Sequence, residues 1–102
     1  MTENFRYHFE WDPLKEASNR RKHGVTFAQA AKVFSDPLTL TLHDEGHSDA
    51  EDRWITLGRA GNGSLLVVVH TYQELNESAA LIRIISARSA TKREKRDYET
   101  GS

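Results

Sequence analysis

The residues most capable of chemistry gather near the end of the chain. Residues 83–96 hold six Lys or Arg residues and one carboxylate, a local charge of +5, although the whole protein has a formal net charge of −1. A near-neutral chain that concentrates its positive charge in one segment is typical of a protein that binds an anion. Nucleic-acid phosphate is the leading candidate for that anion.

Two arginines of this segment, Arg83 and Arg88, belong to a predicted strand. Arg83 interrupts an otherwise apolar run, and Arg88 stands at the strand end with the opposite parity, which predicts opposite faces for the two side chains. An exposed arginine on an open sheet face can hold a phosphate through two parallel hydrogen bonds. The alternative is a structural salt bridge, for instance to Glu10 or Asp12 on a neighbouring strand.

The other cations of the segment lie on a predicted C-terminal helix. Lys92 and Arg93 fall in its first turn, where the helix dipole disfavours cations unless an anion binds there. This placement, continued by Arg96, predicts a phosphate-facing role. In the alternative, charges four residues apart pair on a solvated helix: Arg93 with Asp97, and Lys95 with Glu99.

His70 and Tyr98 are the candidates for proton transfer. His70 ends the apolar run of residues 65–69, and histidine exchanges protons near neutral pH. The alternative is a packed, hydrogen-bonded histidine. Tyr98 is interpreted either as an aromatic residue that docks the final helix on the sheet or as a polar group of the site.

A metal centre is not predicted. His43, Asp44, His47 and Asp49 are metal-ligand types at short spacing, but their order matches no zinc or calcium template. We interpret them as part of an acidic, mobile loop or as a contact for a partner. The sequence also contains no glycine-rich phosphate loop, nucleophile elbow or dinucleotide-binding fingerprint.

The length of 102 residues predicts one domain over residues 1–102. The chain has no cysteine, no apolar segment in its first residues and no apolar run of the roughly 20 residues that a membrane helix needs. We therefore expect a soluble cytoplasmic protein without a membrane partner. Its charge is segregated, because residues 15–22 form a second basic segment and residues 44–52 an acidic one.

The elements that must position these residues can be read from local patterns. Alternating aromatic residues over 5–11 predict a strand. A helix over Pro13–His23 ends at Gly24, and a second helix begins at Thr26 with Gln29 as its capping-box partner.

Four further strands in a meander are predicted, with residues 61–63 as a hairpin and residues 74–78 as a turn. They cover residues 38–42, with three leucines facing inward, and residues 53–59, 65–72 and 80–88. Thr91 and Glu94 cap the final helix. The predicted fold class is α+β: an antiparallel sheet of about four to five strands with its helices on one side.

Several segments, in order and without a large gap, resemble the BrnT toxin family. They are residues 9–19, 22–27, 33–38, 53–58, 65–71 and 83–88, followed by Thr91, Glu94 and Tyr98. The resemblance implies a RelE-like fold and a ribonuclease toxin of a type II toxin–antitoxin pair. It also implies RNA cleavage without a metal or other cofactor, by attack of the ribose 2′-hydroxyl on the adjacent phosphate, and inhibition of translation.

The resemblance further implies a BrnA-like ribbon-helix-helix antitoxin as partner, with promoter DNA touched only through the complex. On this basis we expect Arg83 and Arg88 on the scissile phosphate, and His70 or Tyr98 in proton transfer. Lys92, Arg93 and Arg96 would hold the RNA backbone. Two alternatives remain: a non-enzymatic basic module that binds nucleic acid or an acidic protein, and a degenerate, inactive toxin.

Overall fold

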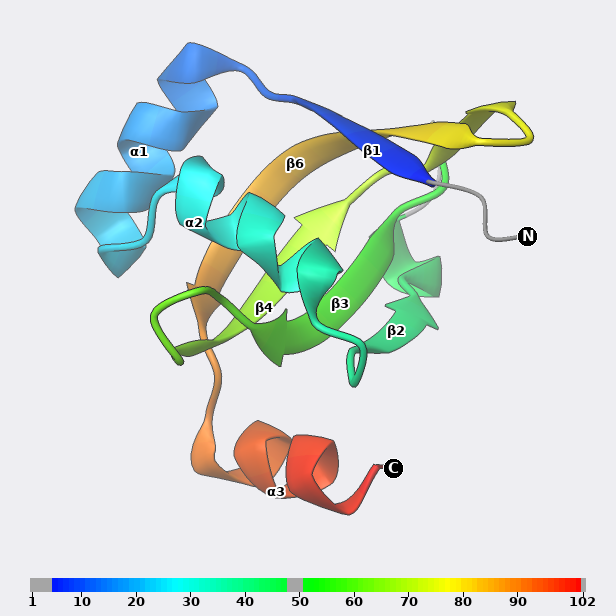
Figure 1. The fold of residues 1–102 in the computed structure, drawn as a ribbon. Helices are drawn as coiled ribbons and strands as arrows, with labels where there is room; N and C mark the ends of the chain where they lie inside the picture. Colours follow the sequence, from blue (N-terminus) through cyan, green and yellow to red (C-terminus); the bar gives the residue numbers. More distant parts are fainter. Residues whose placement is uncertain (1–4, 48–50, 102) are drawn as a thin grey trace.

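The computed structural model describes residues 5–47 and 51–101, and in this part of the chain it shows a six-stranded sheet and three α-helices (Figure 1). The strands are β1 (Arg6–Glu10), β2 (Leu40–His43), β3 (Trp54–Arg59), β4 (Leu65–His70), β5 (Gln73–Asn76) and β6 (Ala79–Ser89). The helices are α1 (Pro13–His23), α2 (Phe27–Ala31) and α3 (Lys92–Thr100), with short 3-10 helices at Lys32–Ser35 and Glu45–His47. The predicted α+β class is confirmed.

The sheet is mixed, and not antiparallel as predicted. Its strand order is β1-β6-β4-β3-β2, with β5 also paired to β6. β1 runs parallel to β6, whereas the remaining neighbours pair antiparallel. The predicted strand count was too low because Gln73–Asn76, which overlaps the predicted turn, adds β5 to the edge of β6.

All three helices begin where their local signals predict, and α1 also ends there. α1 spans Pro13–His23, and Gly24 follows it with φ of 70°, a left-handed conformation that glycine adopts without strain. The capping box of Thr26 and Gln29 starts α2, which gives way to the 3-10 helix after Ala31. The second capping box, formed by Thr91 and Glu94, starts α3.

The two faces of the sheet are covered unequally. α2 and the first 3-10 helix cover one face, which holds the main core of Phe27, Val33, Val68, Ile82, Ile84 and their neighbours, and α1 packs along β6. A smaller cluster of Leu57, Val67 and Tyr98 lies on the other face, where α3 packs at one end (Figure 1). The prediction that all helices lie on one side is therefore wrong for α3.

The three leucines predicted to face inward lie outside the main core. Leu38 and Leu42 are 66% and 70% exposed, and Leu40 is half-buried. Strand alternation instead turns Thr41 toward Thr56, with which it shares a hydrogen bond of 2.9 Å. In the described structure α3 covers only one end of the leucine face, so Leu42 stays in solvent.

The buried side chain of Asn19 joins α1 to β6 as if it were one more strand residue. Its amide nitrogen donates to the Ala87 carbonyl at 2.8 Å, and its oxygen accepts from the Ala87 N–H at 3.1 Å. The same nitrogen donates to the carbonyl of Val25 at 3.2 Å. This pairing satisfies backbone groups of Ala87 on an edge of β6 that none of the described strands covers.

Replacement of Asn19 by Ala should lower the free energy of unfolding by about 2 kcal/mol, because the peptide groups of Ala87 then stay buried without partners. Urea denaturation measures this change. Ser18→Ala, an exposed neighbour on the same helix, serves as the control and should change stability by no more than about 0.5 kcal/mol. Equal stability of the two variants would show that the amide pairing contributes nothing.

Candidate phosphate-binding site

Arg88 lies near the end of β6, opposite Val67 of β4, on the face of the sheet away from α2. Its guanidinium donates two parallel hydrogen bonds to Glu94, from Nη1 to Oε1 and from Nη2 to Oε2, each 2.9 Å long. Nη1 also donates to the Ser89 carbonyl at 3.2 Å. Arginine binds a phosphate through the same bidentate hydrogen bonds. Glu94 therefore occupies the position that a phosphate would take on Arg88.

The Arg88–Glu94 pair is electrostatically strong. Hydrogen bonds from Arg88 lower the pKa of Glu94 to about 2, against the opposing effect of burial, and the same pair raises the pKa of Arg88. Glu94 also accepts from the Thr91 N–H at 2.8 Å, and the Glu94 N–H donates to the Thr91 hydroxyl at 3.1 Å. Two of the N–H groups at the start of α3 are therefore already used by the capping box.

Arg83 forms an ion pair with Glu51, a partner that the sequence did not suggest. Glu10 is only its register neighbour on β1. Arg83 and Arg88 are an odd number of residues apart, which in a regular strand would place them on opposite faces of the sheet. They lie on the same face because the β4–β6 pairing shifts register between Val69 and His70. Since Ile84 and Ala87 both face the main core, Arg83 and Arg88 both face the opposite side of the sheet.

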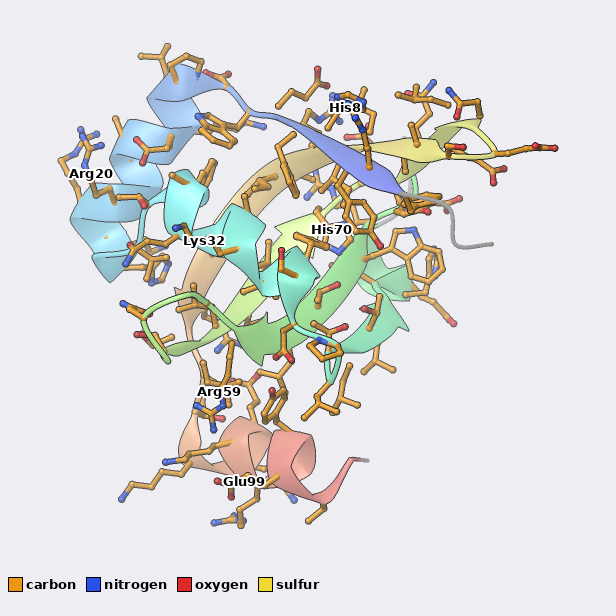
Figure 2. All side chains as sticks on the ribbon, viewed as in Figure 1. His8, Arg20, Lys32, Arg59, His70 and Glu99 are labelled. Atoms are coloured by element: carbon orange, nitrogen blue, oxygen red, sulfur yellow. The ribbon has the colours of Figure 1, made fainter. Side chains whose placement is uncertain are left out.

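His70 is 2% exposed and lies on the helix-covered side of the sheet (Figure 2). Its Nδ1 donates to the Thr71 carbonyl at 2.9 Å, so Nε2 accepts from the Thr56 hydroxyl at 2.7 Å. The ring packs edge-on against Phe34, and burial lowers the pKa of the imidazole. The structure thus places His70 as a packed, hydrogen-bonded residue and does not bring it to Arg88.

Tyr98 docks α3 on the sheet. It is buried beside Leu57 and Val67, and its hydroxyl donates to Asp36 Oδ2 at 2.6 Å, which raises the pKa of the phenol. The Arg59 guanidinium lies 5.3 Å from the centre of its ring. This geometry matches the docking interpretation of Tyr98.

The cations of α3 point away from the sheet. Lys92, Arg93, Lys95 and Arg96 are exposed, whereas Glu94 and Tyr98 face the strands. Within residues 5–47 and 51–101, Glu94 is the acidic residue of α3 that forms a side-chain ion pair, and its partner is Arg88. Asp97 and Glu99 form none with the described residues. The pairs Arg93–Asp97 and Lys95–Glu99, which the alternative interpretation required, are therefore not formed among the described residues, and these cations remain open to a ligand.

The structure adds a histidine to the site that sequence reasoning missed. His23, the last residue of α1, lines a cleft of about 270 Å³ together with Arg88, Glu94 and Ser86. A neighbouring cleft of about 230 Å³ is also lined by His23 and Ser86, and adds Lys15 and Lys22. The second basic segment of the sequence therefore lies beside β6. The sequence motif of residues 22–27 contains His23 and could have drawn attention to it. Only the packing of α1 on β6, however, links this motif to Arg88.

No group of three potential metal ligands occurs within the described residues. In the candidate loop, His43 Nε2 lies 3.1 Å from Asp52 Oδ1, and Asp49 falls outside the described residues. The metal-free site stays a prediction. No helix in the described part of the chain is long and apolar enough to cross a membrane.

The Arg88–Glu94 pair should make stability fall at acid pH. The folded-state pKa of Glu94, about 2, lies below its ordinary value of 4.5, so the pair stabilises the protein above that value and its contribution is lost as the pH falls toward 2. Between about pH 6 and about pH 3, wild type should lose about 1 kcal/mol more than Glu94→Gln in urea denaturation. Glu99→Gln is the control and should behave as wild type; parallel losses in all three proteins would contradict the prediction.

Comparison with known proteins identifies the family. A family model described as "Ribonuclease toxin, BrnT, of type II toxin-antitoxin system" matches residues 11–94. The crystal structure of the Brucella abortus ribonuclease toxin BrnT is similar in fold, with a TM-score of 0.58 and 24% identity over 85% of this chain and 100% of that chain. A comparison with curated protein sequences gave no match. Because the family model spans most of the chain, the protein belongs to the BrnT family of ribonuclease toxins of type II toxin–antitoxin systems.

Proposed function

We propose that the chain cleaves RNA without a metal ion, with Arg88 holding the scissile phosphate. The proposal is supported by the bidentate hydrogen bonding of the Arg88 guanidinium to the carboxylate of Glu94 in an open cleft. A phosphate offers the same pair of oxygens with more negative charge. RNA therefore competes with Glu94 for Arg88 when it enters the cleft.

The proposed reaction is an internal transfer within the RNA. The ribose 2′-oxygen forms a bond to the adjacent phosphorus and the bond from phosphorus to the 5′-oxygen breaks. A base accepts the 2′-hydroxyl proton, and an acid donates a proton to the departing oxygen. Charge that develops on the phosphate oxygens in the transition state is stabilised by the fixed guanidinium of Arg88.

His23 is the proposed proton-transfer group. It is exposed, it shares the cleft with Arg88, and imidazole is the side chain most often used for this task. In this proposal His70 and Tyr98, the candidates from the sequence, act as positioning residues. Both are held by hydrogen bonds inside the protein, to Thr56 and Thr71 and to Asp36, respectively.

The proposed RNA path follows the exposed cations on both sides of Arg88. Lys15 and Lys22 line the adjacent cleft beside α1. Lys92 and Arg93 are exposed in the first turn of α3, and Arg96 continues the same helix. Arg83 faces the same side of the sheet as Arg88 and provides a further phosphate contact when it leaves Glu51.

The proposal includes the biological setting that the family implies. The toxin acts in the cytoplasm, where RNA cleavage inhibits translation. A ribbon-helix-helix antitoxin of the BrnA type neutralises it, and the complex touches promoter DNA through the antitoxin alone. A type II system includes an antitoxin, and the family description supports that partner in general terms.

Arg88→Gln should lower the rate of RNA cleavage by about a hundredfold or more, because the variant lacks the charge that stabilises the transition state. The measurement is cleavage of a labelled RNA by purified protein, with a chelator present, and circular dichroism confirms that the variant folds. Arg6→Gln, an exposed arginine of β1, is the matched control and should cleave as wild type. Full activity of Arg88→Gln would remove Arg88 from the site.

His23→Ala should lower the cleavage rate by about a hundredfold or more, whereas its affinity for an RNA with a 2′-deoxy scissile nucleotide should stay close to that of wild type. His8→Ala, an exposed histidine of β1, is the control. Equal losses of binding and cleavage would make His23 a binding residue. Salt-sensitive binding of duplex DNA by the wild type without any RNA cleavage would favour the non-enzymatic module.

A further inference from the structure

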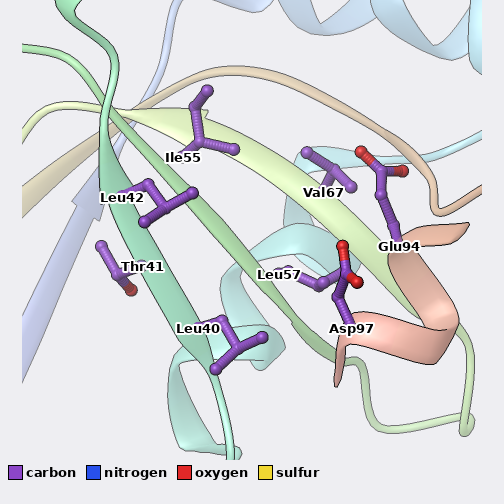
Figure 3. Close-up of a pocket in the computed structure, with 8 residues that line it drawn as sticks. All are labelled: Leu40, Thr41, Leu42, Ile55, Leu57, Val67, Glu94 and Asp97. Atoms are coloured by element: carbon purple, nitrogen blue, oxygen red, sulfur yellow. The ribbon is translucent and has the colours of Figure 1, made fainter. Parts of the chain in front are cut away.

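A second concave surface lies between β2 and α3, next to the Arg88 cleft. This β2–α3 groove has a volume of about 280 Å³. Its lining residues are Leu40, Thr41, Leu42, Ile55, Leu57, Val67, Glu94 and Asp97 (Figure 3). The strands therefore supply an apolar floor, and α3 supplies two carboxylates on one wall.

The floor of the groove is buried at Leu57 and Val67 and open to solvent at Leu42. Leu42 is 70% exposed on a sheet face that α3 covers only at one end. Contiguous apolar surface of this kind is costly in water and commonly marks a site where another protein binds. The exposed Leu42 of β2, at the edge of this apolar floor, thus indicates a partner that contributes apolar side chains.

The charge of the groove separates a protein partner from RNA. Figure 3 shows Glu94 and Asp97 projecting from α3 toward the strands. Glu94 is neutralised by Arg88, but the Asp97 carboxylate makes no ion pair with any described residue. An apolar floor with an unpaired carboxylate repels a phosphate backbone and favours a Lys or Arg side chain beside apolar residues.

We propose that the β2–α3 groove is the docking surface of the antitoxin, and that it takes an amphipathic antitoxin segment. Apolar side chains of that segment pack on Leu42, Ile55 and Val67, and a basic side chain pairs with Asp97. An apolar row with one flanking charge is a recurring way in which a short segment binds a groove. The antitoxin is the occupant because the family description itself includes such a partner.

The docking surface is continuous with the proposed RNA site. Leu42, Ile55, Val67 and Glu94 line both the groove and the Arg88 cleft. An antitoxin segment in the groove therefore covers the approach to Arg88 and excludes RNA by direct competition. This competition rests on the proposed function, whereas the docking itself rests on the shape, apolarity and charge of the groove and on the antitoxin that the family description includes.

Titration calorimetry of the toxin with its cognate antitoxin tests the docking. Leu42→Glu should weaken binding at least tenfold, because a carboxylate then stands on the apolar floor beside Asp97. Leu14→Glu is the matched control, since Leu14 is 80% exposed on α1, and it should bind as wild type. Asp97→Asn should weaken binding severalfold and reduce its dependence on salt. Circular dichroism establishes that each variant folds.

Unchanged antitoxin affinity of Leu42→Glu would overturn the proposal. The proposal would also be overturned if Leu42→Glu lost affinity for an uncleavable 2′-deoxy RNA but kept its affinity for the antitoxin. That result would assign the groove to nucleic acid. The docking can be judged apart from the ribonuclease reaction. If the wild type cleaves no RNA and Leu42→Glu still loses the antitoxin, the docking stands and the proposed reaction fails.

Discussion

Strand β6 is held along both of its edges, and this backbone pairing places every other part of the structure. β1 and β5 flank its first half, and β4 pairs with its second half. Where β1 ends, the amide of Asn19 takes over the free edge at Ala87. Because that one amide also anchors α1, it brings the basic side of α1 next to Arg88 and so creates the candidate site.

The parts of the fold that could be predicted from sequence are those fixed by neighbouring residues. Both capping boxes, the glycine end of α1 and the hairpin before Leu65 depend on side chains within a few positions of one another. The parallel pairing of β1 with β6 joins residues more than seventy positions apart, and no local pattern encodes it. β5 was missed for a related reason, since its polar sequence is compatible with pairing only because β6 offers an edge.

In the candidate site, too, features set by neighbouring residues could be predicted, whereas features set by tertiary packing could not. Charge alone pointed to Arg88, but its partner Glu94 was expected only as a helix cap, and one carboxylate performs both tasks. The prediction that Arg83 and Arg88 lie on opposite faces was wrong, because the irregular β4–β6 register depends on tertiary pairing and not on local sequence. His70 sits at the end of an apolar strand, where the hydroxyl of Thr56 and the carbonyl of Thr71 make burial tolerable. His23 became a candidate only through the packing of α1.

Glu94 stands at the boundary between two surfaces of opposite character. On one side it pairs with Arg88 in the cleft that also holds His23, and on the other it lines the apolar groove with Asp97. α3 turns Glu94 and Asp97 toward the groove and its cations to solvent, so a protein with almost no net charge presents two adjoining surfaces of different character, one proposed for RNA and one proposed for the antitoxin. Because the two surfaces share Leu42, Ile55, Val67 and Glu94, occupants of both cannot bind independently. In a toxin that an antitoxin must silence, such overlap lets binding and inhibition be the same event.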